Sequence, residues 1–96
     1  MWGNMKKKAL TNYEDLFQFL SELCAYLSGI ELPDESESIV RASLFYGGST
    51  TEFMGEARIA LQALKDSTAQ RLDRRWLERI DDVIEQIDWA FRVTGS

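Results

Sequence analysis

Apolar residues recur through most of this chain at the spacing of an α-helix, and this periodicity limits the folds open to it. Between residues 13 and 30 they step by four, three and four, at Leu16, Leu20, Leu23 and Leu27. Near the end of the chain they step by four, four, three, four and three, at Leu72, Trp76, Ile80, Val83, Ile87 and Ala90. Because a helix turns every 3.6 residues, each set lines one helix face. The pattern predicts an all-α fold.

Three breaks separate the helical segments. The first combines Gly29 with Leu32–Pro33, since the residue before a proline avoids the α conformation. The second is Gly47–Gly48, because a glycine readily supplies a left-handed helix end. The third is a turn at Asp66–Thr68. The predicted helices span about residues 12–28, 34–46, 51–66 and 69–92, and their short connections predict a four-helix antiparallel bundle of up-down-up-down topology.

Capping boxes mark three helix starts, at Thr11 with Glu14, Ser49 with Glu52, and Ser67 with Gln70. The second helix has no single apolar stripe, because the apolar residues of 39–46 surround its axis. We therefore expect a central, mostly buried helix there. The same run of β-branched and aromatic residues leaves a strand open as the alternative.

With 96 residues, 45% of them hydrophobic, the chain has enough apolar surface for one domain. Residues 1–10 show no period and are expected to form a flexible N-terminal tail, while residues 11–96 form a single helical domain. Whether the natural start is Met1 or Met5 stays open.

The composition excludes several kinds of catalysis. With no histidine, the chain has no Ser-His-Asp triad and no imidazole base. The single cysteine, Cys24, rules out an intrachain disulfide or a cysteine-rich metal cluster, and its place in the first apolar stripe predicts a buried, inert thiol. We expect no catalytic residues, no metal and no cofactor, and hence a protein that is not an enzyme.

Charge is distributed in blocks, within a net charge of −5. Residues 1–8 carry three lysines, whereas residues 9–40 carry seven acids and no base. Such a chain repels a phosphate backbone and attracts a basic protein, so we expect no nucleic-acid partner. No apolar run is long enough for a membrane span and no secretory leader is recognisable, which predicts a cytoplasmic protein without membrane contact.

Two groups of residues are candidates for contact with a basic partner. The first surrounds Trp89, which the helical wheel places on a polar, acidic face with Asp82, Glu85 and Glu78. An exposed tryptophan ringed by carboxylates suits a lysine- or arginine-rich surface. The second group is the acidic stretch formed by Glu31, Asp34, Glu35 and Glu37.

A basic cluster opens the last predicted helix, at Arg71, Arg74, Arg75 and Arg79. In an up-down bundle it lies at the same end as the acidic stretch, so internal ion pairing is one interpretation. A site for an anion or a partner is the other. Together with Gly47–Thr51, these arginines also raise the possibility of a phosphate-binding site.

Two further faces are more apolar than a simple bundle needs, and both are candidates for self-association. One is the flank of the first helix, with Phe19 and Tyr26; the other is a small-residue face of the third helix, with Gly55, Ile59 and Ala63. We expect one of them to be buried within the fold and the other to associate, and the sequence does not decide which.

These observations predict a small, acidic, non-enzymatic protein-binding module. In size, helical content and acidity it resembles the immunity and antitoxin class of inhibitors, a resemblance that implies inhibition of a basic partner. The alternative is a homodimeric structural or regulatory helical bundle, in which the partner is a second copy of the chain.

Overall fold

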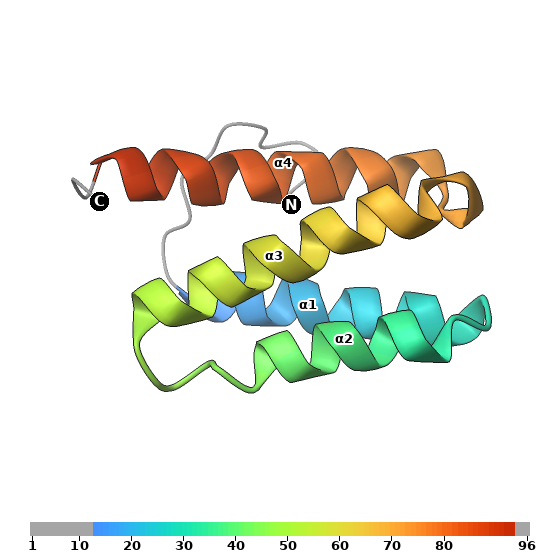
Figure 1. Cartoon of the computed structure of the whole chain (residues 1–96), viewed down its shortest axis with the longest axis horizontal. Helices are drawn as coiled ribbons and strands as arrows, with labels where there is room; N and C mark the ends of the chain where they lie inside the picture. The colour runs from blue at the N-terminus through green and yellow to red at the C-terminus, as the bar shows by residue number, and fades with distance from the viewer. Residues whose placement is uncertain (1–12, 94–96) are drawn as a thin grey trace.

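The computed structural model describes residues 13–93, and within that range the chain forms four α-helices and no strand. The helices are α1 (Tyr13–Gly29), α2 (Pro33–Ser43), α3 (Thr50–Thr68) and α4 (Arg74–Val93), with a short 3₁₀ helix, η1 (Ala69–Arg71), before the last. The all-helical prediction is confirmed. In Figure 1 the chain turns back at each connection, so that each helix lies beside the one before it. The predicted tail, residues 1–10, and the proposed cap at Thr11 lie outside the described residues.

The end of α1 is a Schellman motif. The amide of Leu32 donates to the carbonyl of Leu27 at 2.9 Å, and the amide of Glu31 donates to the carbonyl of Ser28 at 3.2 Å. The residue with left-handed backbone in such a motif is usually a glycine, but here it is Glu31, with φ of 63°. Gly29 is the last helical residue and therefore does not supply this conformation.

α2 begins as predicted, with Pro33 in its first turn, but it ends earlier than predicted, at Ser43. Residues 44–47 form turns instead, and Tyr46 stacks on Phe17 of α1 with ring centroids 4.6 Å apart. The expectation of a central, mostly buried helix is wrong, because α2 buries only Ser36, Ile39 and Ala42. The alternative of a strand over 39–46 is wrong as well.

α3 starts where the sequence indicates. The hydroxyl of Ser49 accepts a hydrogen bond from the amide of Glu52 at 3.3 Å, which confirms this N-cap. The turn before it depends on Gly47, whose φ of 100° is a conformation that other residues rarely adopt. The core side of α3 carries Phe53, Met54, Ala57, Leu61 and Leu64.

α4 begins five residues later than predicted. Leu72 has an extended backbone, with φ of −94° and ψ of 141°, and interrupts the helix after η1. The carboxylate of Asp73 then accepts from the amide of Arg75 at 3.1 Å and caps the new start. The predicted cap at Ser67 is wrong, since that hydroxyl donates back to the carbonyl of Leu64 at 3.5 Å. The Asp73 carboxylate also offsets the unfavourable placement of arginines at the positive end of the α4 dipole.

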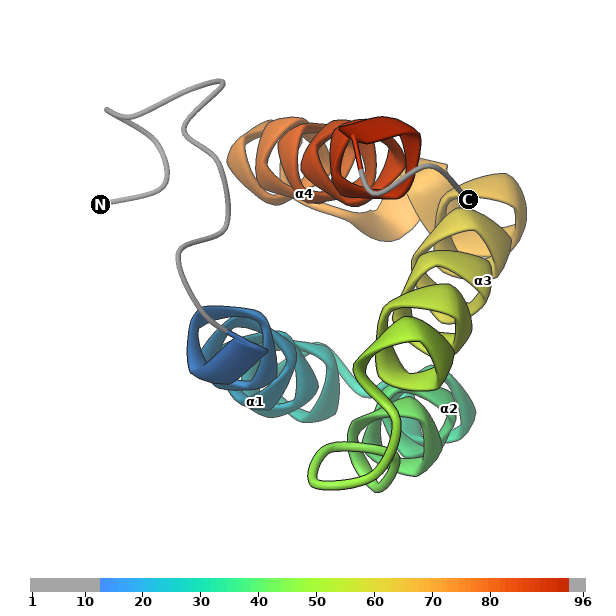
Figure 2. The ribbon, with the colours of Figure 1, turned by 90° about the vertical axis from the view of Figure 1, so that its left-hand side faces the viewer.

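The residues of the hydrophobic core come from all four helices, whose arrangement is seen end-on in Figure 2. The fully buried large side chains of this core are Leu16, Phe19, Leu20, Leu23, Leu27, Ile39, Phe53, Leu61, Ile80, Val83 and Ile87. α1 and α4 are joined by side chains, including the stacked rings of Tyr26 and Trp76, whose centroids are 4.9 Å apart. Within residues 13–93, no helix is both long enough and apolar enough to cross a lipid bilayer.

Candidate partner-binding surface

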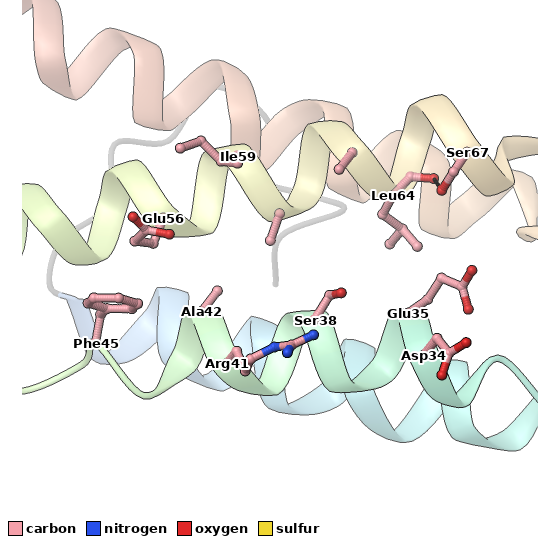
Figure 3. A pocket seen from close by; sticks show the side chains of 12 residues that line it. Asp34, Glu35, Ser38, Arg41, Ala42, Phe45, Glu56, Ile59, Leu64 and Ser67 are labelled. Carbon is pink, nitrogen blue, oxygen red and sulfur yellow. Dashed lines mark hydrogen bonds between the residues drawn. The ribbon is translucent and has the colours of Figure 1, made fainter.

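A groove runs along the outside of the molecule between α2 and α3, with a volume of about 500 Å³ (Figure 3). Its lining includes the short side chains of Ala42, Ala60 and Ala63. Asp34 lies with Glu35 at one end of the groove, close to the end of α3. The groove therefore combines apolar walls with charged side chains, of which Asp34 and Glu35 lie together at one end and Arg41 and Glu56 lie elsewhere in the lining.

Four carboxylates gather where α1 passes into α2, and we call them the acidic corner: Glu31, Asp34, Glu35 and Glu37. Three are exposed and Glu35 is partly buried. Within residues 13–93, none of the four takes part in an ion pair. The corner continues into the α2–α3 groove, because Asp34 and Glu35 belong to both.

The arginines near the start of α4 lie at the same end of the molecule as the acidic corner, but they bond elsewhere. The contacts are those of Arg71 with the carbonyl of Ile30 (3.3 Å), Arg74 with Glu78 (3.6 Å) and Arg79 with Glu22 (3.0 Å). The interpretation that these arginines neutralise the acidic stretch is therefore wrong for the described part of the chain. The four carboxylates of the corner thus take part in no ion pair within residues 13–93, and the nearest of these arginine contacts is that of Arg71 with the carbonyl of Ile30, the residue before Glu31.

The polar face around Trp89 agrees with the helical wheel only in part. Trp89 is 47% exposed, and Glu85 and Glu78 are exposed as well. Asp82 was expected to face water, but it is only 8% exposed and accepts a hydrogen bond from the Gln86 amide at 3.1 Å. The side-chain oxygen of Gln86, Oε1, is buried and has no hydrogen-bond partner among the described residues. Leaving such an atom without a partner lowers the free energy of unfolding by about 1–3 kcal/mol. Asp82 is thus too deeply buried to contact a partner.

The structure does not bring Trp89 and the acidic corner together. The corner lies beside the start of α4, where Arg71 reaches Ile30. Trp89 follows Arg74 by 15 residues, which at the rise of an α-helix is about 22 Å along α4. The predicted partner-binding residues therefore form two separate surfaces.

Of the two surplus apolar faces, the one on α1 is buried. Phe19 is fully buried and lies against Trp76, while the Tyr26 hydroxyl accepts from the amide of Asp73 at 2.7 Å. Phe19 is thus part of the core, and the prediction that it contributes to self-association is wrong. The face of α3 is the exposed one.

On α3, Gly55 is partly exposed and Ala63 is exposed. Ile59 is 62% exposed, a large fraction for a branched apolar side chain. Both Ile59 and Ala63 line the α2–α3 groove. Two of the three residues of the small-residue face that the sequence singled out therefore form part of one wall of this groove, and Gly55 does not line it.

A combined phosphate site is not present. Gly47 to Ser49 end the connection between α2 and α3, and Thr50 and Thr51 begin α3, whereas η1 and the start of α4 lie at the opposite end of the molecule (Figure 1). A second hollow of about 430 Å³ lies near this connection and is lined by Tyr13, Tyr46 and Phe53, with no basic side chain. The arginines and the glycine-rich turn thus do not converge.

Cys24 is partly buried, not fully buried as predicted. Its thiol donates to the carbonyl of Ser36 at 3.7 Å, and the Ser36 hydroxyl donates to the carbonyl of Cys24 at 3.2 Å. Burial raises the pKa of the thiol above its ordinary value, and the contact with Ser36 offsets part of this rise. The raised pKa keeps Cys24 in its unreactive form at neutral pH.

Sequence reasoning missed the residues that complete the groove, namely Ser38, Arg41, Phe45, Glu56 and Ala60. A signal for the α3 wall was present, since residues 56, 60, 63 and 67 step by four, three and four along one face. The wall on α2 was hidden by the expectation that this helix is buried.

Among residues 13–93, no three or more cysteine and carboxylate side chains come together in a group that could hold a metal ion. Comparisons with models of protein families, with curated proteins and with solved structures find no significant match for this chain. The function of the groove and the acidic corner therefore has to be inferred from the chemistry of their own residues.

Proposed function

We propose that this chain is a non-enzymatic protein-binding module that takes up a basic protein partner. The observation that carries the proposal is the acidic corner, whose four carboxylates have no ion pair within residues 13–93 although three arginines bond nearby. Clustered charge of one sign raises the self-repulsion of a fold and is offset when an oppositely charged surface docks. The finer form of the proposal is an inhibitor of the immunity or antitoxin type that neutralises a basic target.

The backbone at Glu31 supports the same proposal. A residue other than glycine in the left-handed region costs about 1–2 kcal/mol, and Glu31 has φ of 63° at a position where helix ends usually carry glycine. Strain of this kind is concentrated at functional sites. A carboxylate at this position is useful to a surface that binds cations, and the fold alone would favour a glycine.

The proposal includes an antiparallel up-down-up-down bundle as the scaffold of the surface. Figure 1 supports it, because successive helices run in opposite directions along the molecule. It also includes a cytoplasmic location, with which the free thiol of Cys24 agrees.

A direct test uses a basic probe and two variants of equal charge. The probe is an 18-residue helical peptide with lysines on one side and leucines and alanines on the other, titrated into the ¹⁵N-labelled chain. The corner variant carries Asp34→Asn, Glu35→Gln and Glu37→Gln. Its matched control neutralises three other exposed acids, Glu14, Glu52 and Asp66, and both variants change the net charge from −5 to −2. The two variants also each remove acids from first turns of helices, so their effects on helix stability are comparable.

We expect the corner variant to bind the probe about tenfold more weakly or worse, because each rim charge contributes up to about 1 kcal/mol. The control should lose much less affinity. Glu31→Gly supplies a further check, since it removes a corner charge and relieves backbone strain, so that stability rises by about 0.5–1 kcal/mol while affinity falls. Equal losses in the two triple variants would contradict a localised site, as would a wild-type chain that does not bind the probe.

The alternative function, a homodimeric bundle, is favoured by the exposure of Ile59 and Ala63 on α3. Sedimentation velocity at micromolar concentration separates the two functions, because a species of 11.0 kDa removes the homodimer. A stable dimer that Ile59→Asp dissociates would favour the alternative.

A further inference from the structure

We propose that the α2–α3 groove docks one amphipathic helix of the basic partner, with the helix's apolar side in the groove and its basic side chains at the end marked by Asp34 and Glu35. This inference rests on the proposed function and names the segment of the partner that the surface receives.

The shape of the groove suits a helix that brings its own large side chains. Ala42 on α2 and Ala60 and Ala63 on α3 are short, and they leave the groove of about 500 Å³ open between the two helices. The groove extends from Asp34 to Phe45, which is 11 residue steps along α2 and the following turn, or about 16 Å at the helical rise. Three turns of a docked helix match this length, with anchors spaced three, four and seven residues apart.

Ile59 provides the apolar contact that a docked helix would cover. Its side chain is 62% exposed at the rim of the groove, and the neighbouring lining residues Ala60 and Ala63 extend the same apolar surface. Covering the exposed part of an isoleucine corresponds to roughly a 5- to 25-fold change in Kd.

Charge selects the occupant. The groove carries three carboxylates, on Asp34, Glu35 and Glu56, against one guanidinium, on Arg41. Asp34 and Glu35 lie together at one end, while Arg41 extends along α2 toward Ser38 (Figure 3). A second copy of this chain would bring the same net negative charge against this one, whereas a helix with lysines or arginines near Asp34 and Glu35 complements it.

The test compares two substitutions that make the same change of charge. Ile59→Asp alters the groove, and Leu44→Asp alters a side chain that is 74% exposed and does not line it. Both add one negative charge, so attraction of a basic peptide by charge alone would leave binding equal or tighter in both. The probe is the 18-residue lysine- and leucine-containing helix, compared with a permuted peptide of the same composition whose leucines do not form one face.

We expect Ile59→Asp to weaken binding of the amphipathic peptide at least tenfold and Leu44→Asp to leave it within about twofold, with no comparable binding of the permuted peptide. Chemical shift changes should include the amides of Ala42, Ala60 and Ala63. Ala63→Glu, at a second exposed groove position, also adds one negative charge and should weaken binding as well, which guards against a folding defect in the first variant.

Three results would overturn the inference. If Ile59→Asp binds as the wild type does while the corner variant does not, the groove is not the site although the proposed function holds. Equal binding of the two peptides would show that the groove does not recognise an apolar face of the peptide. A dimer that Ile59→Asp dissociates would make a second copy the occupant. Failure of the wild type to bind either peptide would instead contradict the proposed function itself.

Discussion

Arg79 links α1 to α4 through two kinds of contact, and removing it should reveal how much each contributes. Its guanidinium carbon lies 4.4 Å from the ring centroid of Trp76 and 5.2 Å from that of Phe19. One of its terminal nitrogens lies 3.0 Å from a carboxylate oxygen of Glu22. Trp76 belongs to α4 like Arg79 itself, so the contacts with Phe19 and Glu22 are the ones that join α4 to α1, and Arg79→Gln, which removes all three, should destabilise the fold.

The size of the expected loss of stability follows from the exposure of the Arg79 and Glu22 side chains. The Arg79 side chain is 27% exposed, so its contact with the rings is largely shielded from water and worth up to about 2 kcal/mol. The ion pair with the half-exposed Glu22 adds about 0–1 kcal/mol. Arg79→Gln should therefore cost about 2 kcal/mol, or roughly 8–16 °C in Tm for a chain of this size, and Glu22→Gln about 0.5 kcal/mol, or roughly 2–4 °C.

Thermal and urea unfolding followed by circular dichroism measure both values. Arg79→Lys keeps the charge but loses the planar group, so its stability should fall between those of the wild type and Arg79→Gln. Arg74→Gln is the control, because Arg74 is 89% exposed and its contact with Glu78 at 3.6 Å should contribute little. Equal losses in Arg79→Gln and Glu22→Gln would refute the reasoning, since the rings would then add nothing to the ion pair.

Two further predictions concern the thiol and the turn before α3. Because burial raises the pKa of Cys24, the folded state retains the thiol proton to higher pH than the unfolded chain; the resulting stabilisation is present at low pH and is lost as pH rises through the raised pKa. A thiol reagent at pH 8 should therefore react more slowly with the native chain than with the chain in urea, and equal rates would contradict this. Gly47→Ala should cost about 1–2 kcal/mol in urea unfolding, because φ of 100° strains any residue with a Cβ although no atom lies within 4 Å of the added carbon. Gly48→Ala is the control and should cost less, since the added carbon meets the Phe45 carbonyl oxygen at an ordinary 3.5 Å.

The helices were predictable because their causes are local. The leucines of α1 repeat at helical spacing, and Ser49 and Glu52 supply a cap that the structure contains. The start of α4 was not predicted, because Ser67 with Gln70 has the spacing of a capping box and conceals the role of Asp73. Ser67 and Asp73 are both possible N-caps within a few residues of each other. The extended backbone of Leu72 interrupts the helix and leaves Asp73 as the cap of α4.

Whether a helix face is buried depends on which other helix packs against it, and the sequence predicted this less well. The many apolar residues of 39–46 suggested a central helix, yet α2 ends at Ser43, Leu44 is exposed and Tyr46 packs on Phe17 of α1. Asp82 shows the converse, since a carboxylate on a polar helix face is buried with Gln86. A helical wheel gives directions about one axis and contains no information about the neighbouring helix.

The candidate surface likewise depends on contacts between residues that are far apart in the sequence. The acidic stretch was visible as a block of sequence, but only the folded chain shows that the nearby arginines bond to Ile30, Glu78 and Glu22 instead. The groove appears when α2 and α3 lie side by side, because its two walls come from segments that the glycine-rich turn separates. Larger side chains at positions 60 and 63 would fill the space between the two helices and leave no groove. Ala60 and Ala63 on α3 line the same groove as Asp34 and Glu35 on α2, two carboxylates that take part in no ion pair within residues 13–93, so the basic helix proposed above would cover both features together.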